Sequence, residues 1–148
     1  MAASILEIGG NREEPMSEIL KAKKLGDSVG GIVECEISGM PVGIGTPMFD
    51  GLENKISQAV FGIPAVKGIE FGLGFEAARV FGSENNDDFY YEDDPNPGLR
   101  SGGVQTHVRT RTNNHGGILG GISSGMPIIF RVAFKLTPSI ARKQNTIL

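Results

Sequence analysis

An α+β fold, with helices packed on a mixed or antiparallel sheet, is what the 148-residue sequence predicts. Two observations support this fold class. Segments near 31–38, 66–75 and 127–135 alternate between apolar and polar residues, as half-buried strands do. Segments over 15–25 and about 50–61 carry helix signals, but helices and strands do not alternate with the rhythm of a parallel sheet. We therefore expect the three strands to lie in one sheet, with the second helix on its apolar face.

Each predicted helix has recognisable ends. The first begins at a proline and stops at a glycine, with acidic residues early and basic residues late, which matches the helix dipole. In the second, Asp50 and Glu53 resemble a capping pair, and apolar residues recur along one face (Phe49, Leu52, Ile56, Ala59 and Val60). The first dozen residues of the chain are predicted to be a frayed or truncated lead-in.

The faces of the predicted strands indicate what their side chains meet. Cys35 lies on the apolar face of its strand, so we interpret it as a small buried residue, with a reactive thiol as the alternative. Along 66–75, glycines alternate with Ile69, Phe71, Leu73 and Phe75, which predicts close approach by a neighbouring backbone or by a flat ligand. In the last strand the core-facing residues are Ile128, Phe130, Val132 and Phe134.

Composition excludes several classes of protein. Fourteen Lys and Arg oppose 17 Asp and Glu, and a net charge of -3 argues against a dedicated nucleic-acid binder. No apolar run approaches the ~20 residues that span a bilayer, so we predict no membrane segment. One cysteine cannot form an internal disulfide or a cysteine-rich zinc site, and we predict no metal site. Without a recognisable secretory signal, these features favour one domain in the cytoplasm.

Residues from about 84 to 112 are predicted to form a long surface excursion. Its first part is acidic and broken by prolines, whereas residues 104–112 alternate and are basic. The two parts either pair as a protruding hairpin held partly by opposite charge, or carry charge that only keeps the loop soluble. Because such a loop is too polar to fill a core, we expect 84–103 to be mobile or to contribute to a subunit contact.

The best candidate for chemistry is the glycine-rich segment 113–125 together with the strand that follows it. Glycine pairs at 116–117 and 120–121 allow backbone N–H groups to turn toward an anion or a ring. After the strand, the ammonium of Lys135 is followed by two hydroxyl side chains, a set that can clamp a phosphate. The spacing matches neither a Walker A loop nor a dinucleotide fingerprint, and purely structural glycine turns are the alternative.

His107 and His115 are the only histidines in the chain. Either could act as a general base, but no Ser, Cys or Asp at a recognisable catalytic spacing accompanies them. We therefore interpret both as surface or hydrogen-bonding residues and predict no catalytic residue among the 148.

Longer motifs follow one another along about residues 15–145. They are Asp27-Ser28-Val29-Gly30-Gly31, Gly43-Ile44-Gly45-Thr46-Pro47-Met48-Phe49-Asp50, Ile63-Pro64-Ala65-Val66-Lys67-Gly68-Ile69-Glu70, Gly82-Ser83-Glu84-Asn85-Asn86-Asp87 and Gly116-Gly117-Ile118-Leu119-Gly120-Gly121-Ile122-Ser123-Ser124-Gly125. In this order they resemble the chorismate synthase family.

The resemblance implies a lyase of the shikimate pathway in aromatic amino acid biosynthesis. Members of the family eliminate phosphate from 5-enolpyruvylshikimate 3-phosphate in a 1,4-anti reaction that gives chorismate and requires reduced FMN. They are homotetrameric flavoproteins with an α+β sandwich fold, and NADP is a further expected nucleotide. Carried over residue by residue, the resemblance implies flavin contacts at Pro64, Ala65, Gly120, Lys135, Leu136, Thr137, Pro138 and Ser139.

The chain also departs from the family pattern. Members are much longer, and the arginines and catalytic histidines of the family have no counterpart here; neither His107 nor His115 matches them. Leu136 stands where proline is usual, Thr46 replaces an acid, and His115 replaces a frequent small residue. We therefore expect a partial domain over 1–148, an internal chorismate synthase segment that is inactive alone. The alternative is a non-catalytic fragment that binds flavin or phosphate or only self-associates.

Overall fold

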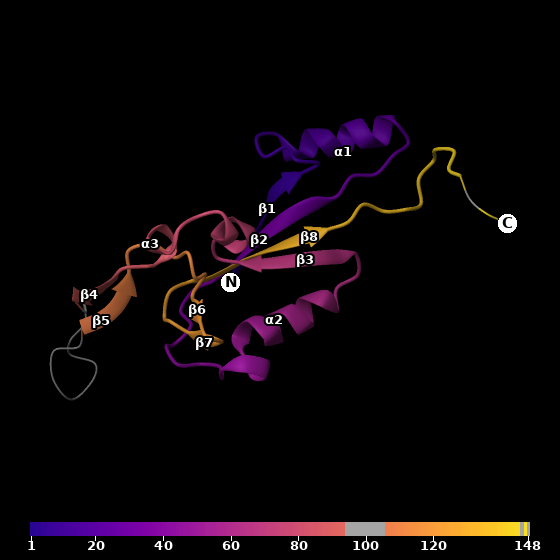
Figure 1. Ribbon diagram of the computed structural model, residues 1–148. Coiled ribbons are helices and arrows are strands. Elements are labelled where there is room, and N and C mark those ends of the chain that lie inside the picture. The colour runs from indigo at the N-terminus through magenta and orange to yellow at the C-terminus, as the bar shows by residue number, and fades with distance from the viewer. Residues whose placement is uncertain (94–105, 146, 148) are drawn as a thin grey trace.

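The computed structural model describes residues 1–93, 106–145 and 147. Its centre is a four-stranded sheet in the order β1-β2-β8-β3, shown in Figure 1. The strands are β1 (Ala2–Ile8), β2 (Gly31–Ile37), β8 (Ile128–Phe134) and β3 (Val66–Phe71). Every neighbouring pair is antiparallel. This confirms the α+β class and the prediction that the three expected strands share one sheet.

The prediction of a frayed N-terminus is wrong, because β1 pairs with β2 along its length. Ala2 lies opposite Glu36, and Ile8 lies opposite Gly31. Ile8 is buried, and the turn after it closes with reciprocal backbone hydrogen bonds to Asn11. The strand escaped prediction because four of its residues are exposed on this sheet edge, so its sequence lacks a clean apolar alternation.

The helices lie close to their predicted ranges. Helix α1 (Pro15–Lys24) adjoins β1, and α2 (Leu52–Phe61) follows a short 3-10 turn, η1 (Met48–Asp50), and adjoins β3. The predicted capping pair is wrong: Gly51 is the N-cap of α2 and no side chain caps it, while Asp50 pairs instead with Lys55 at 2.5 Å. A side chain at position 51 would meet the backbone of Gly121 at 2.9 Å, which explains the glycine.

One face of the sheet forms the core with α2. Along β8, Ile128, Phe130 and Val132 are buried, and their alternation gives β8 the predicted apolar face. Leu52, Ile56 and Val60 of α2, together with Cys35, pack against these residues. Cys35 thus points toward the core, as predicted, but is only partly buried, and this burial, reinforced by the neighbouring Glu34 carboxylate, raises the pKa of its thiol. Phe49, expected on the same stripe of α2, instead lies in η1 and is exposed.

The third strand is shorter than predicted, because the chain turns after Phe71. A 3-10 turn, η2 (Gly74–Ala78), follows, and Phe75 is exposed rather than aligned with the strand. Gly72 has a positive φ, and a side chain there would overlap the backbone of Asn114 and Gly116. At Gly72, the close approach predicted for the glycines of this segment is therefore made by a neighbouring backbone.

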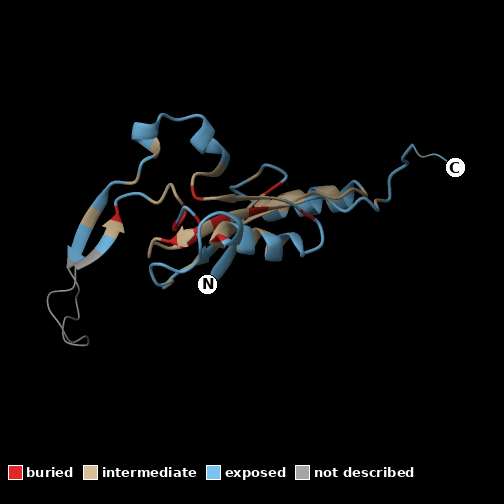
Figure 2. Ribbon diagram, turned by 60° about the horizontal axis from the view of Figure 1, so that its bottom comes forward, coloured by how far each residue is buried: buried red, intermediate tan, exposed pale blue. Residues whose placement is uncertain are grey.

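The chain after η2 leaves the sheet. Helix α3 (Gly82–Asn85) leads into a hairpin of β4 (Phe89–Asp93) and β5 (Thr106–Thr110), and a second small hairpin joins β6 (Ile118–Leu119) to β7 (Ile122–Ser123). Figures 1 and 2 show the β4–β5 hairpin and the C-terminal tail at opposite ends of the molecule. Among the described residues, no helix has the length and apolar character that a membrane crossing requires.

The excursion is the predicted protruding hairpin, but its base is anchored. Arg109 pairs with Glu92 at 3.1 Å across the hairpin, which supports the proposed pairing of opposite charges. Thr110 is buried, and the side chain of Asp87 is only 6% exposed, so the expectation that this whole region is surface is wrong at both positions. Half of the range 84–103, for which mobility or a subunit contact is expected, lies outside the described residues, and this expectation stays a prediction.

Candidate functional site

Three loops meet at one end of the sheet. Because β2 and β3 each run antiparallel to β8, both begin where β8 ends: Gly31 and Val66 each lie opposite Phe134. The loop after β8 therefore emerges between the loops that precede β2 and β3. Its first residue, Lys135, donates its backbone N–H to the carbonyl of Ala65 at 2.9 Å. The topology thus brings Pro64 and Ala65 together with the segment 135–139, as the predicted site requires.

The loop before β2 holds this segment from the other side. Ser28 donates its hydroxyl to the carbonyl of Thr137 at 2.5 Å, and a side chain at Gly30 would meet the carbonyl of Phe134 at 2.5 Å. Further along, Arg142 contacts Asp27 at 2.8 Å, an interaction that, after the backbone N–H of Ser28, helps to lower the pKa of that carboxyl. The motif 27–31 is therefore a docking strip for the chain that leaves β8.

Ala65 has an unusual backbone conformation. Its φ is 72°, in the left-handed region that non-glycine residues rarely adopt. This conformation turns the chain from α2 into β3 and aims the carbonyl of Ala65 at Lys135. Residues held in such conformations cluster at ligand sites, because the surrounding structure must compensate for the strain.

Lys135 is the cation of this site. It is exposed and makes no ion pair with any residue that the structure describes. Arg131, four residues earlier on the sheet face opposite the core, is instead neutralised by Glu34 at 2.8 Å and Glu70 at 3.3 Å. Leu136, Thr137, Pro138 and Ser139 are likewise exposed. An exposed ammonium followed by two hydroxyls can bind a phosphate group.

Gly120 is not brought to this cluster. It lies in the exposed turn of the β6–β7 hairpin, whose next residue, Gly121, accepts the N–H of Leu52 at 2.9 Å. The turn is therefore at the N-terminal end of α2, whereas Ala65 follows the C-terminal end. Ten helical residues separate the two ends, which is about 15 Å at 1.5 Å per residue. Within one chain, Gly120 and Lys135 thus belong to separate surfaces.

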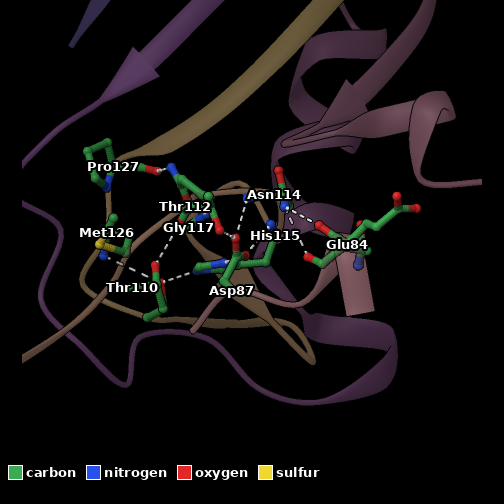
Figure 3. A network of polar contacts seen from close by, with 12 residues as sticks. Glu84, Asp87, Thr110, Thr112, Asn114, His115, Gly117, Met126 and Pro127 are labelled. Carbon is green, nitrogen blue, oxygen red and sulfur yellow. Dashed lines mark hydrogen bonds and ion pairs between the residues drawn. The ribbon is translucent and has the colours of Figure 1, made fainter. Parts of the chain in front are cut away.

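A buried polar cluster that sequence reasoning missed surrounds Asp87. Figure 3 shows Thr112, Asn114 and His115 gathered about its carboxylate. The backbone N–H groups of Asn114 and His115 donate to it at 2.8 and 2.9 Å, and the hydroxyl of Thr112 and Nδ1 of His115 are further partners. On the other side of the imidazole ring, Nε2 of His115 lies 2.7 Å from Oγ of Ser124.

The hydrogen bonds of this cluster keep Asp87 ionised. Burial alone would raise the pKa of the carboxyl, but the donors from Thr112, His115 and the backbone outweigh burial and lower the pKa to about 2. In the sequence, Asp87 ends the family-like motif 82–87 within an acidic stretch, and such a stretch is typical of a solvated loop. The signal for burial is tertiary, since Asp87 and His115 are 28 residues apart.

The described fold is that of an α+β protein with an antiparallel sheet and, at one end, an open loop that carries an exposed lysine. The family model for chorismate synthase matches residues 8–148. Chorismate synthase from Dehalococcoides mccartyi is 51% identical over 129 residues, covering 87% of this chain and 32% of its own. The enzyme from Methanocaldococcus jannaschii is 48% identical over 137 residues, covering 93% and 33%. The chain belongs to the chorismate synthase family.

A solved structure agrees with this assignment. A crystal structure of chorismate synthase matches with a TM-score of 0.71 at 37% identity, covering 84% of this chain and 35% of that chain. The predicted resemblance and fold class are thus confirmed. The chain spans about a third of the length of the curated relatives it matches.

Proposed function

We propose that this chain supplies the flavin-phosphate contacts of a chorismate synthase. The observation that carries the proposal is the exposed Lys135, which forms no ion pair with any described residue, lies beside Ala65 and is followed by Thr137 and Ser139. The residues fit an FMN phosphate, because one ammonium, two hydroxyls and the backbone N–H groups of an exposed loop are donors that a phosphate accepts. Pro64, Leu136 and Pro138 would form apolar contacts around it.

The proposed reaction is the family's elimination of phosphate from 5-enolpyruvylshikimate 3-phosphate to give chorismate. Reduced FMN, when bound, supplies electron density to the substrate while phosphate leaves. The part of this chain is to bind and orient: Lys135 balances phosphate charge, and the docked 135–142 segment keeps the loop in place. None of the residues assigned here moves a proton in the reaction.

A second candidate is a non-catalytic module that binds flavin or phosphate, or that only self-associates. It rests on the same exposed loop, whose ammonium, hydroxyls and backbone N–H groups can bind a phosphate whether or not the chain takes part in catalysis. The cytoplasmic location, the homotetramer and the link to NADP that the resemblance implies are parts of the same proposal.

FMN titration of the chain, followed by flavin fluorescence, tests the proposal. Lys135→Gln should weaken FMN binding about tenfold, which corresponds to the loss of one exposed charge-assisted contact. Lys23→Gln, an equally exposed change on α1, is the matched control and should leave the Kd unchanged. Equal effects of the two substitutions would assign the loss to overall charge rather than to this site.

A further inference from the structure

A series of hydrogen bonds from Asp87 through His115 to Ser124 closes the base of the glycine-rich β6–β7 hairpin. His115 precedes β6 and Ser124 follows β7, so the bond of 2.7 Å between Nε2 and Oγ joins the two ends of the segment that carries Gly120. A backbone bond from Ser124 to the carbonyl of Gly117, at 3.0 Å, runs beside it. The side chain of His115 is only 7% exposed, so water does not compete easily for its bonds.

The direction of each bond follows from the chemistry of Asp87. An ionised carboxylate can only accept hydrogen bonds, and Asp87 already accepts two backbone N–H groups. The facing Nδ1 of His115 must therefore carry a proton. In the neutral imidazole Nε2 is then the acceptor, and the hydroxyl of Ser124 donates to it. Asp87 thus selects the tautomer that can hold Ser124.

The far end of the hairpin is wedged against α2. The carbonyl of Gly121 accepts the N–H of Leu52 at 2.9 Å, and a side chain at Gly121 would meet the carbonyl of Thr46 at 2.5 Å. With its tip packed in this way and its base tied by His115, the hairpin has little freedom to tilt. Within the turn, Gly121 is buried, whereas Gly120 is exposed and has open space around it.

We propose that His115 is a positioning residue: held by Asp87 and bonded to Ser124, it fixes the glycine-rich hairpin so that Gly120 is presented to the flavin. This inference rests on the proposed function, which makes Gly120 a flavin contact. Because Gly120 lies about 15 Å from the Ala65 end of α2, it would reach a different part of the flavin, or a flavin clamped by another copy of the chain.

Two isosteric variants separate positioning from mere filling of space. The amide of His115→Gln reaches the place of Nε2 and can still bond Ser124, whereas the amide of His115→Asn reaches only the place of Nδ1 and bonds Asp87 alone. We expect His115→Asn, His115→Ala and Ser124→Ala each to weaken FMN binding about tenfold. The Kd of His115→Gln for FMN should stay within about threefold of the parent chain's. Ser4→Ala, on exposed β1, is the control for Ser124→Ala.

Hydrogen exchange of backbone amides tests whether His115 fixes the hairpin independently of whether the chain binds FMN. The N–H groups of Ser123 and Ser124 should exchange about tenfold faster in His115→Asn and Ser124→Ala, and near the parent rate in His115→Gln. If the parent chain binds no FMN, the proposed function fails, and with it the flavin role of His115; exchange rates then still test whether His115 fixes the hairpin. Equal behaviour of the Asn and Gln variants would overturn the positioning role.

The ring nitrogens of His115 give a direct test of the bond directions. Nitrogen NMR, at a pH where the ring is neutral, should find the proton on Nδ1 and a bare Nε2 in the parent chain. Asp87→Asn, whose amide no longer selects one tautomer, should mix the two forms. A parent ring with its proton on Nε2 and a bare Nδ1 would contradict the proposed arrangement.

Discussion

Asp87 shows how far a single carboxylate can organise a loop. Its side chain is almost completely buried, and it accepts hydrogen bonds from a hydroxyl, an imidazole and two backbone N–H groups. Replacing this carboxylate with an amide would lose hydrogen bonds, because the NH2 group of the amide would face N–H or O–H donors. The segment 112–115 therefore depends on the charge of residue 87.

Asp87→Asn should lower the free energy of unfolding by about 3 kcal/mol at neutral pH, as expected when buried charge-assisted hydrogen bonds are lost. Denaturant unfolding of the chain measures this change. Asp88→Asn, at an exposed position, is the matched control and should change stability by less than about 0.5 kcal/mol. Equal values for the two variants would show that the carboxylate of Asp87 is not the anchor.

The same carboxyl predicts a pH dependence. Its pKa is lowered from 3.8 to about 2 in the folded chain, so the stabilisation is complete above the ordinary value and is lost as the pH falls toward 2. The difference in unfolding free energy between the parent and Asp87→Asn should be constant above about pH 5 and shrink below about pH 4. A difference that stays constant down to the folded pKa would contradict the assignment.

Gly30 gives a prediction about the docking strip. Gly30→Ala places Cβ 2.5 Å from the carbonyl of Phe134 and 3.2 Å from the backbone nitrogen of Leu136, and neither is the end of a flexible side chain. The backbone must shift, which should cost about 1–3 kcal/mol and move the NMR signals of 135–137. Gly82→Ala, with open space around it, should be neutral or slightly stabilising.

At the scale of elements, segments with a strong apolar periodicity were predictable from the sequence, whereas the edge strand β1 and the end of β3 were not. Strand β8 and helix α2 each carry an apolar face that the core uses, so their ranges and contacts followed from spacing alone. Strand β1 has mostly exposed side chains, and β3 stops early because Gly72 must turn against Asn114. Backbone approach of this kind is decided by a segment about 40 residues away, which no local pattern encodes.

The candidate site, too, was predictable from the sequence only in part. The meeting of Ala65 with Lys135 follows from antiparallel strand order, once the strands are known. The separation of Gly120 from them, and the link between Asp87 and His115, depend on where loops pack. Motif resemblance supplied Gly120 as a contact but could not say which surface carries it.

The core strand β8 can be tested by truncation. Ile128 is fully buried, so Ile128→Ala should reduce the free energy of unfolding by about 3–4 kcal/mol, the combined cost of lost burial and a residual cavity. Ile5→Ala, on the edge strand and half exposed, should cost less than about 1 kcal/mol. Comparable losses would place the core elsewhere.

At the scale of the whole molecule, we expect no turnover by this chain alone. Phosphate elimination needs cations around the leaving group and a poised proton acceptor, and no described residue is assigned as that acceptor. Incubation with reduced FMN and 5-enolpyruvylshikimate 3-phosphate under anaerobic conditions should give no chorismate. Adding the remaining segments of a homologous chorismate synthase should restore it, whereas turnover by the chain alone within about tenfold of a complete enzyme would show that catalytic groups were overlooked.

The claim that Lys135 and its neighbours hold the phosphate of FMN is tested most directly by comparing FMN with riboflavin, which has the same ring system but no phosphate. We expect the chain to bind FMN about tenfold more tightly than riboflavin. Lys135→Gln should remove most of this preference and leave the affinity for riboflavin unchanged. Equal affinity of the parent chain for both flavins, or a preference for FMN that survives Lys135→Gln, would contradict it.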